Sequence, residues 1–411
     1  MFNAHKILQS TGKGLDDREF FDPNVQSEAK RYHQNIRLGA LLHDLGTFCF
    51  SHTTEQAYIA FGRDKPANKE KKRKDDHEHL GSFIIKNTYY KGGISEVLAR
   101  FDIDPQEISD LVKGISTNIL ANQILHSEVD CDRMDYLLRD AHYTGLNYGT
   151  YDRDYLLHHF VVDKVDGKEI LAINHNALHS VEDFLSARFA WYSQVVRSPR
   201  GAKYDSLAED MTYFLLEKKE IHSYDTLLEM TKGDPIAFYA FNDQYFMGTL
   251  HRLYGAGFFK KYPRERSICE SLLFAKSPKT IRLPEFAQHL LDESEVSENG
   301  KIFKRAKEKL DEINAFLRKN GTKEDWVVED IPERKILFTQ SKKSLVKEKS
   351  QSNLLLERDP TKIKTESGQV QLLVDVENSL ISKLQNHFNF IPNVYCSHSF
   401  YDRLKESGMA N

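Results

Sequence analysis

The sequence is poor in cysteine and lacks a long apolar run. Its four cysteines lie far apart and show no CxxC spacing: Cys49, Cys131, Cys269 and Cys396. This distribution argues against a disulfide framework and against a zinc knuckle. The N-terminal segment MFNAHKILQSTGKG has no apolar signal-peptide core, and no uncharged apolar stretch is long enough to span a bilayer. We therefore expect a cytoplasmic protein with no membrane partner.

The sequence also lacks a large excess of either positive or negative charge. The 57 lysine and arginine residues are nearly balanced by 61 aspartate and glutamate residues, which gives a net charge of −4 over 411 residues. Such a chain has no global attraction for nucleic acid, so any site for a polyanion has to be local. The lysine-rich run from Lys69 to Lys74 could contact phosphate, but charge runs are more often solvated loops, and we expect a loop. Nucleic acid is kept as an alternative partner on this run alone.

Helical periodicity dominates the first part of the chain. Apolar residues three and four positions apart recur over residues 36–45, 92–101, 105–115, 132–141, 180–196 and 204–219. The segment FVVDKVDGKEILAI departs from this pattern, because its Asp166-Gly167 pair between β-branched runs predicts a hairpin. With 40% apolar residues, the chain can bury a core of substantial size.

The later part of the chain has a different character. A polar helix is predicted over residues 298–319, followed by the strand-like pieces WVVEDI, KILFTQ, IKTESGQVQLLVDV and NVYCS. We therefore predict a mainly α fold class, with a helical core over residues 1–255 and a smaller helical and α+β region over residues 256–411.

The stretch LLHDLGTFCFSHTTE places a His-Asp pair at the end of an apolar helix. Ile36, Ala40 and His43 share one helix face, so the imidazole emerges on the side that packs inward. A buried imidazole beside the carboxylate of Asp44 is costly unless it is compensated, and a divalent cation is an efficient compensator. The alternative is that a helix end followed by Gly46 holds both side chains in solvent.

Three further segments carry candidate functional residues. In SEVDCDRMDYLLRDAHYTG, Asp132, Tyr136 and Asp140 align along one helical stripe. In DDHEHLGSFII, a His-Glu-His run opens a helix, and in VEDFLSARFAWYSQVVRSPRG an arginine stands one turn before Trp191. Each has an ordinary alternative: an amphipathic helix with internal Asp-Arg pairs, an acidic helix start, and a core helix with an exposed arginine.

Taken together, these segments resemble the HD-domain phosphohydrolases, in the branch of the deoxynucleoside triphosphate triphosphohydrolases. The resemblance rests on LLHDLGTFCFSHTTE, DDHEHLGS, VDCDRMDYLLRDAHYTGLNYGTYDRDYL and FLSARFAWYSQVV, which occur in the family's order. It implies an HD-domain helical bundle that hydrolyses a dNTP to a deoxynucleoside and triphosphate. It also implies a homo-oligomer, either a dimer or a tetramer.

The resemblance implies one divalent metal ion, Mn, Mg, Fe or Ni, held by a pattern His…His-Asp…Asp. The pair maps onto His43 and Asp44, and the last ligand maps onto Asp132. The family's first histidine lies in a segment of the type R-F-x-H-S-L-G. His5 stands at a similar separation, but its context MFNAHKILQ is more like the helix after that segment. We therefore expect an N-terminally truncated pattern that lacks this ligand, with His5 as the alternative.

The remaining site residues are also assigned by the resemblance. His52 is placed to act on the scissile phosphate ester, with His77 and Glu78 orienting it. The expected substrate contacts are Arg133, Tyr136, Asp140 and Arg188.

One segment departs from the family pattern. Thr47, Phe48 and Cys49 stand where relatives have His, Gly and Pro. Two alternatives to dNTP hydrolysis therefore stay open: a catalytically impaired nucleotide-binding or regulatory protein, and a hydrolase of other phosphate esters.

Overall fold

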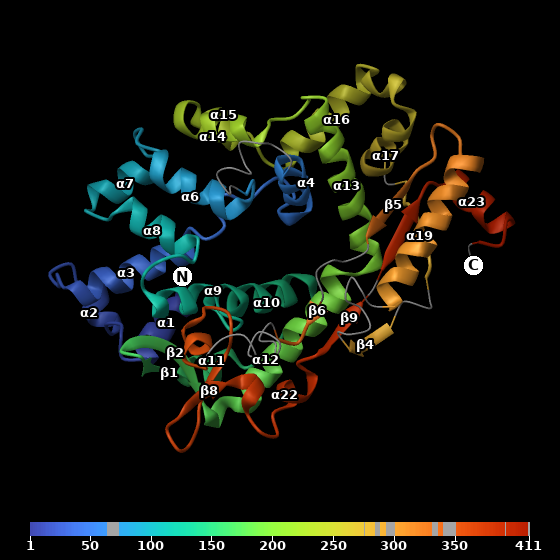
Figure 1. The fold of residues 1–411 in the computed structure, drawn as a ribbon. Coiled ribbons are helices and arrows are strands. Elements are labelled where there is room, and N and C mark those ends of the chain that lie inside the picture. The colour runs from blue at the N-terminus through green and yellow to red at the C-terminus, as the bar shows by residue number, and fades with distance from the viewer. Residues whose placement is uncertain are drawn as a thin grey trace. The chain divides into compact units, whose positions relative to one another are not determined.

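The computed structural model describes residues 1–63, 74–274, 276–283, 288–292, 301–330, 336–339, 351–390 and 392–409 (Figure 1). The described chain is mainly helical with a small α+β part, which confirms the predicted fold class. Two compact units can be distinguished. Unit 1 consists of Met1–Leu45, Gly81–Val195 and Ile336–His387, and unit 2 consists of Gly46–Leu80, Val196–Lys335 and Phe388–Asn411.

The units do not follow the predicted boundary at residue 255. In unit 2, helix α13 (Pro199–Glu217) precedes that position but packs against α17 (Pro263–Leu273) and strand β5 (Val327–Asp330), which follow it. The chain passes between the units several times, so neither unit is one continuous segment.

Unit 1 is built around a cluster of short helices with local stop and start signals. Asp104, Asn118 and Asp130 each cap the helix that follows by accepting a backbone N–H. The helices that begin in or belong to this unit are α1 (Phe2–Ser10), α2 (Asp17–Phe21), α3 (Glu28–Leu41), α7 (Ile94–Arg100), α8 (Pro105–Val112), α9 (Ile119–His126), α10 (Cys131–Thr144), α11 (Arg153–His158), η1 (His175–Ala177), α12 (Leu178–Trp191), η2 (Tyr192–Val196), α21 (Gln351–Leu356), η4 (Leu373–Asp375) and α22 (Leu380–Leu384). The first turns of α6 (His77–Asn87) lie in unit 2 and its remainder in unit 1.

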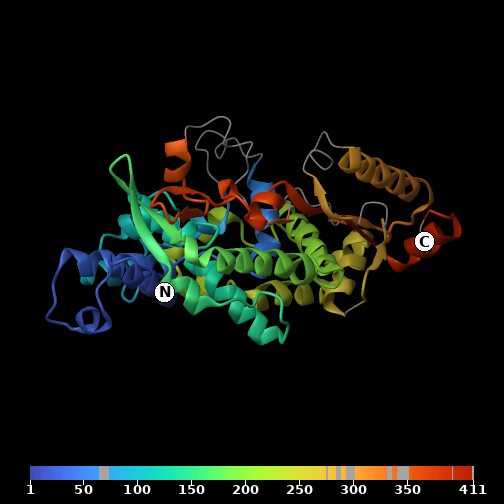
Figure 2. The ribbon, with the colours of Figure 1, turned by 90° about the horizontal axis from the view of Figure 1, so that it is seen from below.

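The sheet of unit 1 begins with the predicted hairpin. Strands β1 (Phe160–Val165) and β2 (Lys168–Asn174) pair antiparallel, and Asp166 and Gly167 between them have φ values of 50° and 77°. Positive φ at both turn positions is the conformation that an Asp-Gly pair favours, so the hairpin prediction is confirmed. Strand β2 then pairs in parallel with β7 (Lys362–Lys364), which pairs antiparallel with β8 (Val370–Leu372). The green hairpin is also seen in Figure 2.

Unit 2 combines helices with a small antiparallel sheet. Its helices are α4 (His52–Arg63), α13, α14 (Tyr224–Gly233), α15 (Pro235–Tyr239), α16 (Asp243–Gly255), η3 (Phe258–Lys261), α17, α19 (Lys301–Asn320) and α23 (His398–Glu406). Strand β10 (Asn393–Cys396) lies between β3 (Lys279–Ile281) and β5. Of the remaining short strands, β4 (Gln288–Asp292) lies in unit 2, β6 (Ile336–Leu337) lies in unit 1, and β9 (His387–Phe390) begins at the last residue of unit 1 and continues in unit 2.

The strands predicted in the later sequence are therefore divided between sheets. β7 and β8 complete the sheet of unit 1, whereas β5 and β10 belong to unit 2. The polar helix predicted over residues 298–319 is α19. Among the described residues, no helix combines the length and the apolar character that a membrane crossing needs.

Candidate functional site

The structure brings three of the predicted metal ligands together in unit 1. Helix α3 ends at Leu41, so His43 and Asp44 lie in the turn that follows rather than on the helix, as the sequence had suggested. Asp132 lies in the first turn of α10. One ligand atom from each of His43, Asp44 and Asp132 lies within 4.8 Å of the others. We call these three residues the metal-ligand group.

The electrostatics of this group favour a bound cation. Burial alone would lower the pKa of His43, but contact with Asp44 and the charge of Asp132 outweigh burial and raise it to about 9. Burial, and next the charge of Asp130, raise the pKa of Asp132 to about 6. The raised pKa of Asp132 shows that its carboxylate is costly to ionise, and the raised pKa of His43 shows that its imidazole keeps a proton. Both shifts are what an excess of negative charge produces. Two carboxylates and an imidazole fit a divalent ion of the Mn, Mg, Fe or Ni type.

His126 lies beside the metal-ligand group, although the sequence analysis did not select it. It is the last residue of α9, and its ring centroid is 5.4 Å from that of His43. Its Nε2 donates to the Leu111 carbonyl over 2.7 Å. Burial, followed by the charge of His43, lowers the pKa of His126 to about 4, so the ring is neutral at physiological pH. A single histidine at a helix end gives little sequence signal.

The predicted substrate residues of α10 lie on the exposed side of this helix or are held by neighbours. Arg133 donates to the Ser127 carbonyl over 2.9 Å and forms an ion pair with the capping residue Asp130. The hydroxyl of Tyr136 lies 3.2 Å from that of Tyr192. Asp140 is half-buried one turn further along α10. Arg133 is thus held in one orientation by Ser127 and Asp130.

Arg188 occupies a different setting from the one predicted. It is only 5% exposed and donates to the Phe338 carbonyl over 3.2 Å. Its Nη2 lies 3.7 Å from Oε1 of the fully buried Glu128. The other oxygen of Glu128 accepts from Thr339 and Thr361 over 2.8 and 3.2 Å. Arg188 therefore neutralises a buried carboxylate of the unit 1 core, a role that differs from gripping a terminal phosphate.

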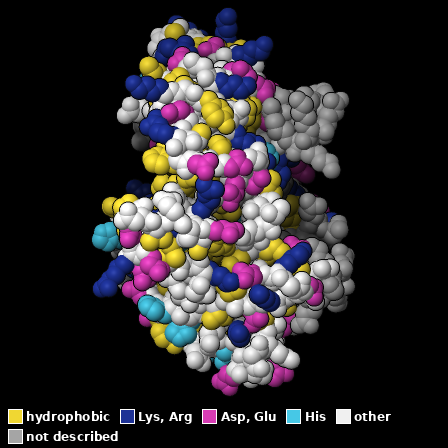
Figure 3. Space-filling model, turned by 90° about the vertical axis from the view of Figure 1, so that its left-hand side faces the viewer, with side chains coloured by type: hydrophobic (Ala, Val, Ile, Leu, Met, Phe, Trp, Pro, Cys, Tyr) yellow, Lys and Arg dark blue, Asp and Glu magenta, His cyan; other side chains and the backbone are white. Residues whose placement is uncertain are grey.

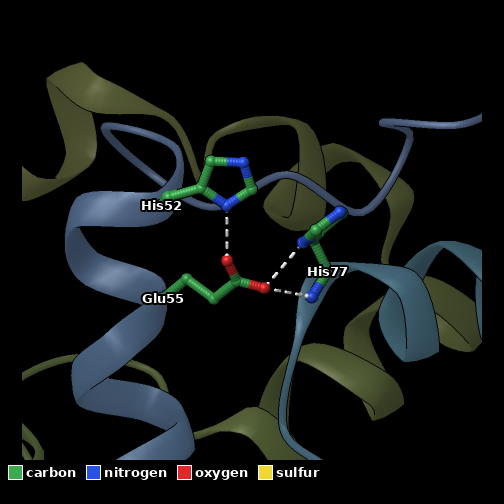
Figure 4. A group of neighbouring side chains, drawn as sticks. All are labelled: His52, Glu55 and His77. Atoms are coloured by element: carbon green, nitrogen blue, oxygen red, sulfur yellow. Dashed lines mark hydrogen bonds and ion pairs between the residues drawn. The ribbon is translucent and has the colours of Figure 1, made fainter. Parts of the chain in front are cut away.

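A second group of titratable side chains lies in unit 2 (Figure 4). His52 is the first residue of α4, Glu55 lies one turn later, and His77 opens α6. The two oxygens of Glu55 are divided between the histidines, at 2.7 Å from Nδ1 of His52 and 2.7 Å from Nδ1 of His77. The backbone N–H of His77 also donates to Glu55 over 2.8 Å. We call these three residues the His-Glu-His group.

Glu55, rather than the predicted Glu78, is the carboxylate that orients His52. The side chain of Glu55 is 4% exposed, whereas that of His52 is 70% exposed. Burial would raise the pKa of Glu55, but hydrogen bonds from His52 and His77 outweigh burial and hold that pKa well below its usual range. An ionised carboxylate that accepts from Nδ1 leaves Nε2 of His52 as the nitrogen for proton transfer. The spacing His-Thr-Thr-Glu was the available sequence signal.

His79 does not belong to the His-Glu-His group. Its Nδ1 lies 2.7 Å from Asp76, whose carboxylate also accepts the backbone N–H of His79. Such a contact at the start of α6 is a capping interaction.

Two of the three residues that depart from the family pattern pack into the core of unit 2, whereas Thr47 is exposed. Phe48 and Cys49 are buried, and the ring centroid of Phe48 lies 4.7 Å from that of Tyr58. The Cys49 thiol donates to the Asn242 carbonyl. Burial raises the pKa of this thiol to about 12, so Cys49 is an inert packing residue. These residues hold the turn before α4 and thereby position His52.

His5, the alternative metal ligand, is engaged in a separate hydrogen-bond chain of unit 1. The Leu15 N–H donates to Nδ1 of His33, so Nε2 of His33 carries the hydrogen and donates to Nδ1 of His5 over 2.8 Å. Nε2 of His5 then donates to Asp17 over 2.7 Å. Both ring nitrogens of His5 are occupied, and the structure does not place it in the metal-ligand group. This corrects the sequence-based alternative.

The chain of His5 and His33 is expected to make stability depend on pH. Burial lowers the pKa of His33 to about 4, and burial also lowers that of His5. Both pKa values lie below those of the unfolded chain, so the stabilisation is complete above about pH 6.5 and is lost as the pH falls toward 4. We expect wild type to lose of the order of 1–3 kcal/mol over this range, measured by urea unfolding.

A His33→Gln variant provides the comparison for this prediction. Glutamine keeps a hydrogen-bonding amide but cannot be protonated, so the fall in unfolding free energy between pH 7 and pH 4.5 should be smaller than in wild type. Equal pH slopes in the two proteins would contradict the assignment.

Unit 1 contains a pocket of about 530 Å³. One lining residue, Gly114, lies close to His126 and Arg358. A Cβ atom at this position would lie 3.0 Å from the His126 ring and would clash with the Arg358 side chain. The volume is in the range of small-molecule sites. The pocket is lined by Gly114, Ile119, Asn122, Asn353, Leu356, Glu357 and Arg358.

The lysine-rich run offered as a nucleic-acid contact is not defined by the structure. Residues 69–73 lie outside the described residues, and only Lys74 is described. On the face drawn in Figure 3, the described basic side chains are interspersed with acidic ones.

Comparisons with known proteins give partial matches. No family model matches the chain. It is 30% identical over 184 residues to the uncharacterised protein YwfO of Bacillus subtilis. The aligned region is 44% of this chain and 37% of YwfO. Over 219 residues it is 27% identical to an uncharacterised protein of Methanocaldococcus jannaschii, which covers 53% of this chain and 41% of that protein. The chain thus matches well under half the length of these relatives.

Two solved structures share the fold over nearly the whole chain. A hypothetical protein from Aquifex aeolicus matches 98% of this chain and 83% of its own, with a TM-score of 0.61 and 19% identity. A phosphohydrolase from Bacteroides thetaiotaomicron matches 96% of this chain and 84% of its own, with a TM-score of 0.56 and 14% identity. At these identities the likeness establishes a common fold.

Proposed function

We propose that this protein is a metal-dependent phosphohydrolase of the HD type that acts on nucleotides. The observation that carries the proposal is the metal-ligand group, in which two carboxylates and an imidazole converge and their charges favour a cation. The ordered motifs and the fold shared with a Bacteroides phosphohydrolase support it. Within this class we propose hydrolysis of a dNTP to a deoxynucleoside and triphosphate.

His43, Asp44 and Asp132 would hold the divalent ion in unit 1. When bound, such an ion polarises a phosphoryl oxygen and lowers the pKa of a water molecule. Arg133 is already oriented by Asp130 and Ser127, so it can contact a phosphate with little further loss of entropy. The pocket lined by Arg358 and Asn122 offers room for a polar ligand in the same unit.

We assign proton transfer to His52. In the proposed reaction, water attacks the α-phosphorus and loses a proton, the bond from phosphorus to the 5′ oxygen breaks, and the 5′ oxygen takes up a proton. Nε2 of His52 would supply that proton, because Nδ1 is held by Glu55. His77 shares the carboxylate and keeps it in place. Tyr136 and Asp140 remain the proposed contacts of the sugar and phosphates.

The product pattern is the direct test of this proposal. Purified protein with Mn²⁺, Mg²⁺, Ni²⁺ or Fe²⁺ is expected to convert a dNTP to deoxynucleoside and intact triphosphate, separated by ion-exchange chromatography. In ¹⁸O-water, the label should enter the triphosphate and not the 5′ hydroxyl, because the attack is on phosphorus. Release of only orthophosphate or pyrophosphate would overturn the dNTP assignment and favour hydrolysis of another phosphate ester.

The burial of Arg188 favours one alternative, a catalytically impaired nucleotide-binding or regulatory protein. An arginine that pairs with Glu128 in the core is not available for a terminal phosphate without loss of that pair. Thr47 in place of the family's histidine supports the same alternative. Saturable dNTP binding in calorimetry, with no turnover at micromolar protein and any of the four metals, would favour this function.

A further inference from the structure

We propose that Asp243 is a positioning residue for proton transfer by His52, because it holds the strained turn from which the helix of His52 begins. The proposal rests on the proposed function, since it concerns the residue to which proton transfer is assigned. Asp243 lies outside all the motifs, 193 residues after its contact in the turn, Phe50.

The two residues before His52 both adopt left-handed backbone conformations. Phe50 has a φ of 54° and Ser51 has a φ of 56°. Among the residues that the structure describes, six non-glycine residues have a positive φ, and only these two are adjacent in the sequence. For a residue with a side chain, this conformation costs roughly 1–2 kcal/mol. A turn with two such residues persists only when its surroundings hold it, and turns of this kind cluster at functional sites.

Contacts from the start of α16 hold this turn. The Phe50 N–H donates to Oδ1 of Asp243, the first residue of α16, over 2.7 Å. The Cys49 thiol donates to the Asn242 carbonyl over 3.0 Å. The rings of Phe50 and Phe246 meet edge to face, with centroids 5.8 Å apart. Of these contacts, only that of Asp243 is charge-assisted, and such bonds are about twice as strong as neutral ones.

The strained turn leads directly into the first turn of α4. The Thr53 N–H donates to the Phe50 carbonyl over 3.2 Å, so the backbone on both sides of His52 is tied to a strained residue. Proton transfer through Nε2 of His52 requires Nδ1 to stay 2.7 Å from Glu55 (Figure 4). Relaxation of Phe50 and Ser51 to negative φ changes the direction in which the chain enters α4, and it moves the His52 backbone relative to Glu55.

Asp243 therefore acts through the placement of His52, and its loss should be seen in kcat. Asp243→Ala removes the acceptor of the Phe50 N–H. We expect this variant to lower kcat for a dNTP roughly 10-fold to 10²-fold, with little change in KM or in Mn²⁺ affinity. Asp243→Asn keeps an oxygen acceptor at the same position, so its kcat should stay within about threefold of wild type.

Asp225→Ala is the matched control for the loss of a carboxylate. Asp225 is an exposed acid in the first turn of α14, another helix of unit 2, and it is not the acceptor of Phe50. Both substitutions remove a negative charge from a helix start, which costs about 0.3–1 kcal/mol of stability. Asp225→Ala should nevertheless keep the kcat of wild type.

Two double variants separate positioning from a general loss of stability. In the His52→Ala background, Asp243→Ala should lower kcat no further, because residues that act as a unit are strongly non-additive. Ser51→Gly should restore much of the kcat lost in Asp243→Ala. Glycine adopts a positive φ without steric cost, and the Ser51 side chain is exposed, so the turn then depends less on Asp243.

Hydrogen–deuterium exchange tests the hold on the turn without catalysis. We expect faster exchange over residues 49–55 in Asp243→Ala than in wild type, and a return toward the rate of wild type when Ser51→Gly is added. Unchanged exchange in Asp243→Ala, unchanged kcat, or losses that multiply with His52→Ala would each remove the positioning role while the proposed function stands. If wild type turns over no dNTP with any of the four metals, the proposed function and the positioning role both fail.

Discussion

An Asp132→Ala variant is expected to lose its divalent ion and, with it, its hydrolase activity. The substitution leaves His43 and Asp44 without the carboxylate that α10 contributes. We expect Mn²⁺ affinity to fall by at least about 100-fold, which corresponds to roughly 2.7 kcal/mol. Turnover should fall by roughly 10³-fold, because the loss of several kcal/mol of Lewis-acid stabilisation costs a factor of ten per 1.36 kcal/mol. Calorimetry and the triphosphate assay measure the two effects.

Asp135→Ala is the matched control for this prediction. Asp135 lies on the same helix, but its carboxylate is exposed and pairs with Arg139 one turn away. Exposed pairs of this kind contribute little to stability, so this variant should resemble wild type in Mn²⁺ affinity and turnover. Equal Mn²⁺ affinity in Asp132→Ala and Asp135→Ala would show that the three side chains do not form the metal site.

Elements governed by local sequence were predicted well. The Asp166-Gly167 hairpin is confirmed because both residues adopt the positive φ that the turn needs. The end of α3 was placed too late, because the apolar period continues through Leu42 and Leu45 after the backbone has left the helix at Leu41. Periodicity reports which side chains face the core and does not report where the backbone hydrogen bonds stop.

The organisation into two units was not predictable from local signals. It depends on pairing between distant segments, such as the parallel contact of β2 with β7, in which Ile173 lies opposite Ile363. A change of composition near residue 255 reflects the strands that follow and not the boundary of a unit. Contacts of this sequence separation leave no periodic mark in either partner.

The candidate site was predicted where its residues follow the motifs. His43, Asp44 and Asp132 came from two motifs, and the structure brings them together. Glu55 was missed because Glu78 stands next to His77 in the sequence and was taken as its carboxylate partner. The contact between Glu55 and His77, which are 22 residues apart, is formed only by the fold. Arg188 was on the expected helix, but its face turns toward Glu128 in the core.

A Glu55→Gln variant is expected to lower kcat by roughly 10² to 10⁴-fold with little change in KM. Its carboxylate is ionised across the usual assay range, since hydrogen bonds from His52 and His77 hold the Glu55 pKa well below its ordinary value despite burial. The amide is nearly the same size but lacks the negative charge that accepts from Nδ1 of His52, and this interaction matters most while the proton moves. Steady-state kinetics with a dNTP measure the effect.

A double-mutant cycle with His52 decides whether Glu55 acts through that residue. If Glu55 only orients and supports His52, then His52→Ala should be as slow as the double variant His52→Ala with Glu55→Gln, because groups that act as a unit are strongly non-additive. A purely structural role for Glu55 would instead give effects that multiply. Mn²⁺ affinity should match wild type in all three variants, since none of the metal-ligand residues is changed. A capping contact such as that of His79 with Asp76 provides the control, and Asp76→Asn should leave kcat within about twofold of wild type.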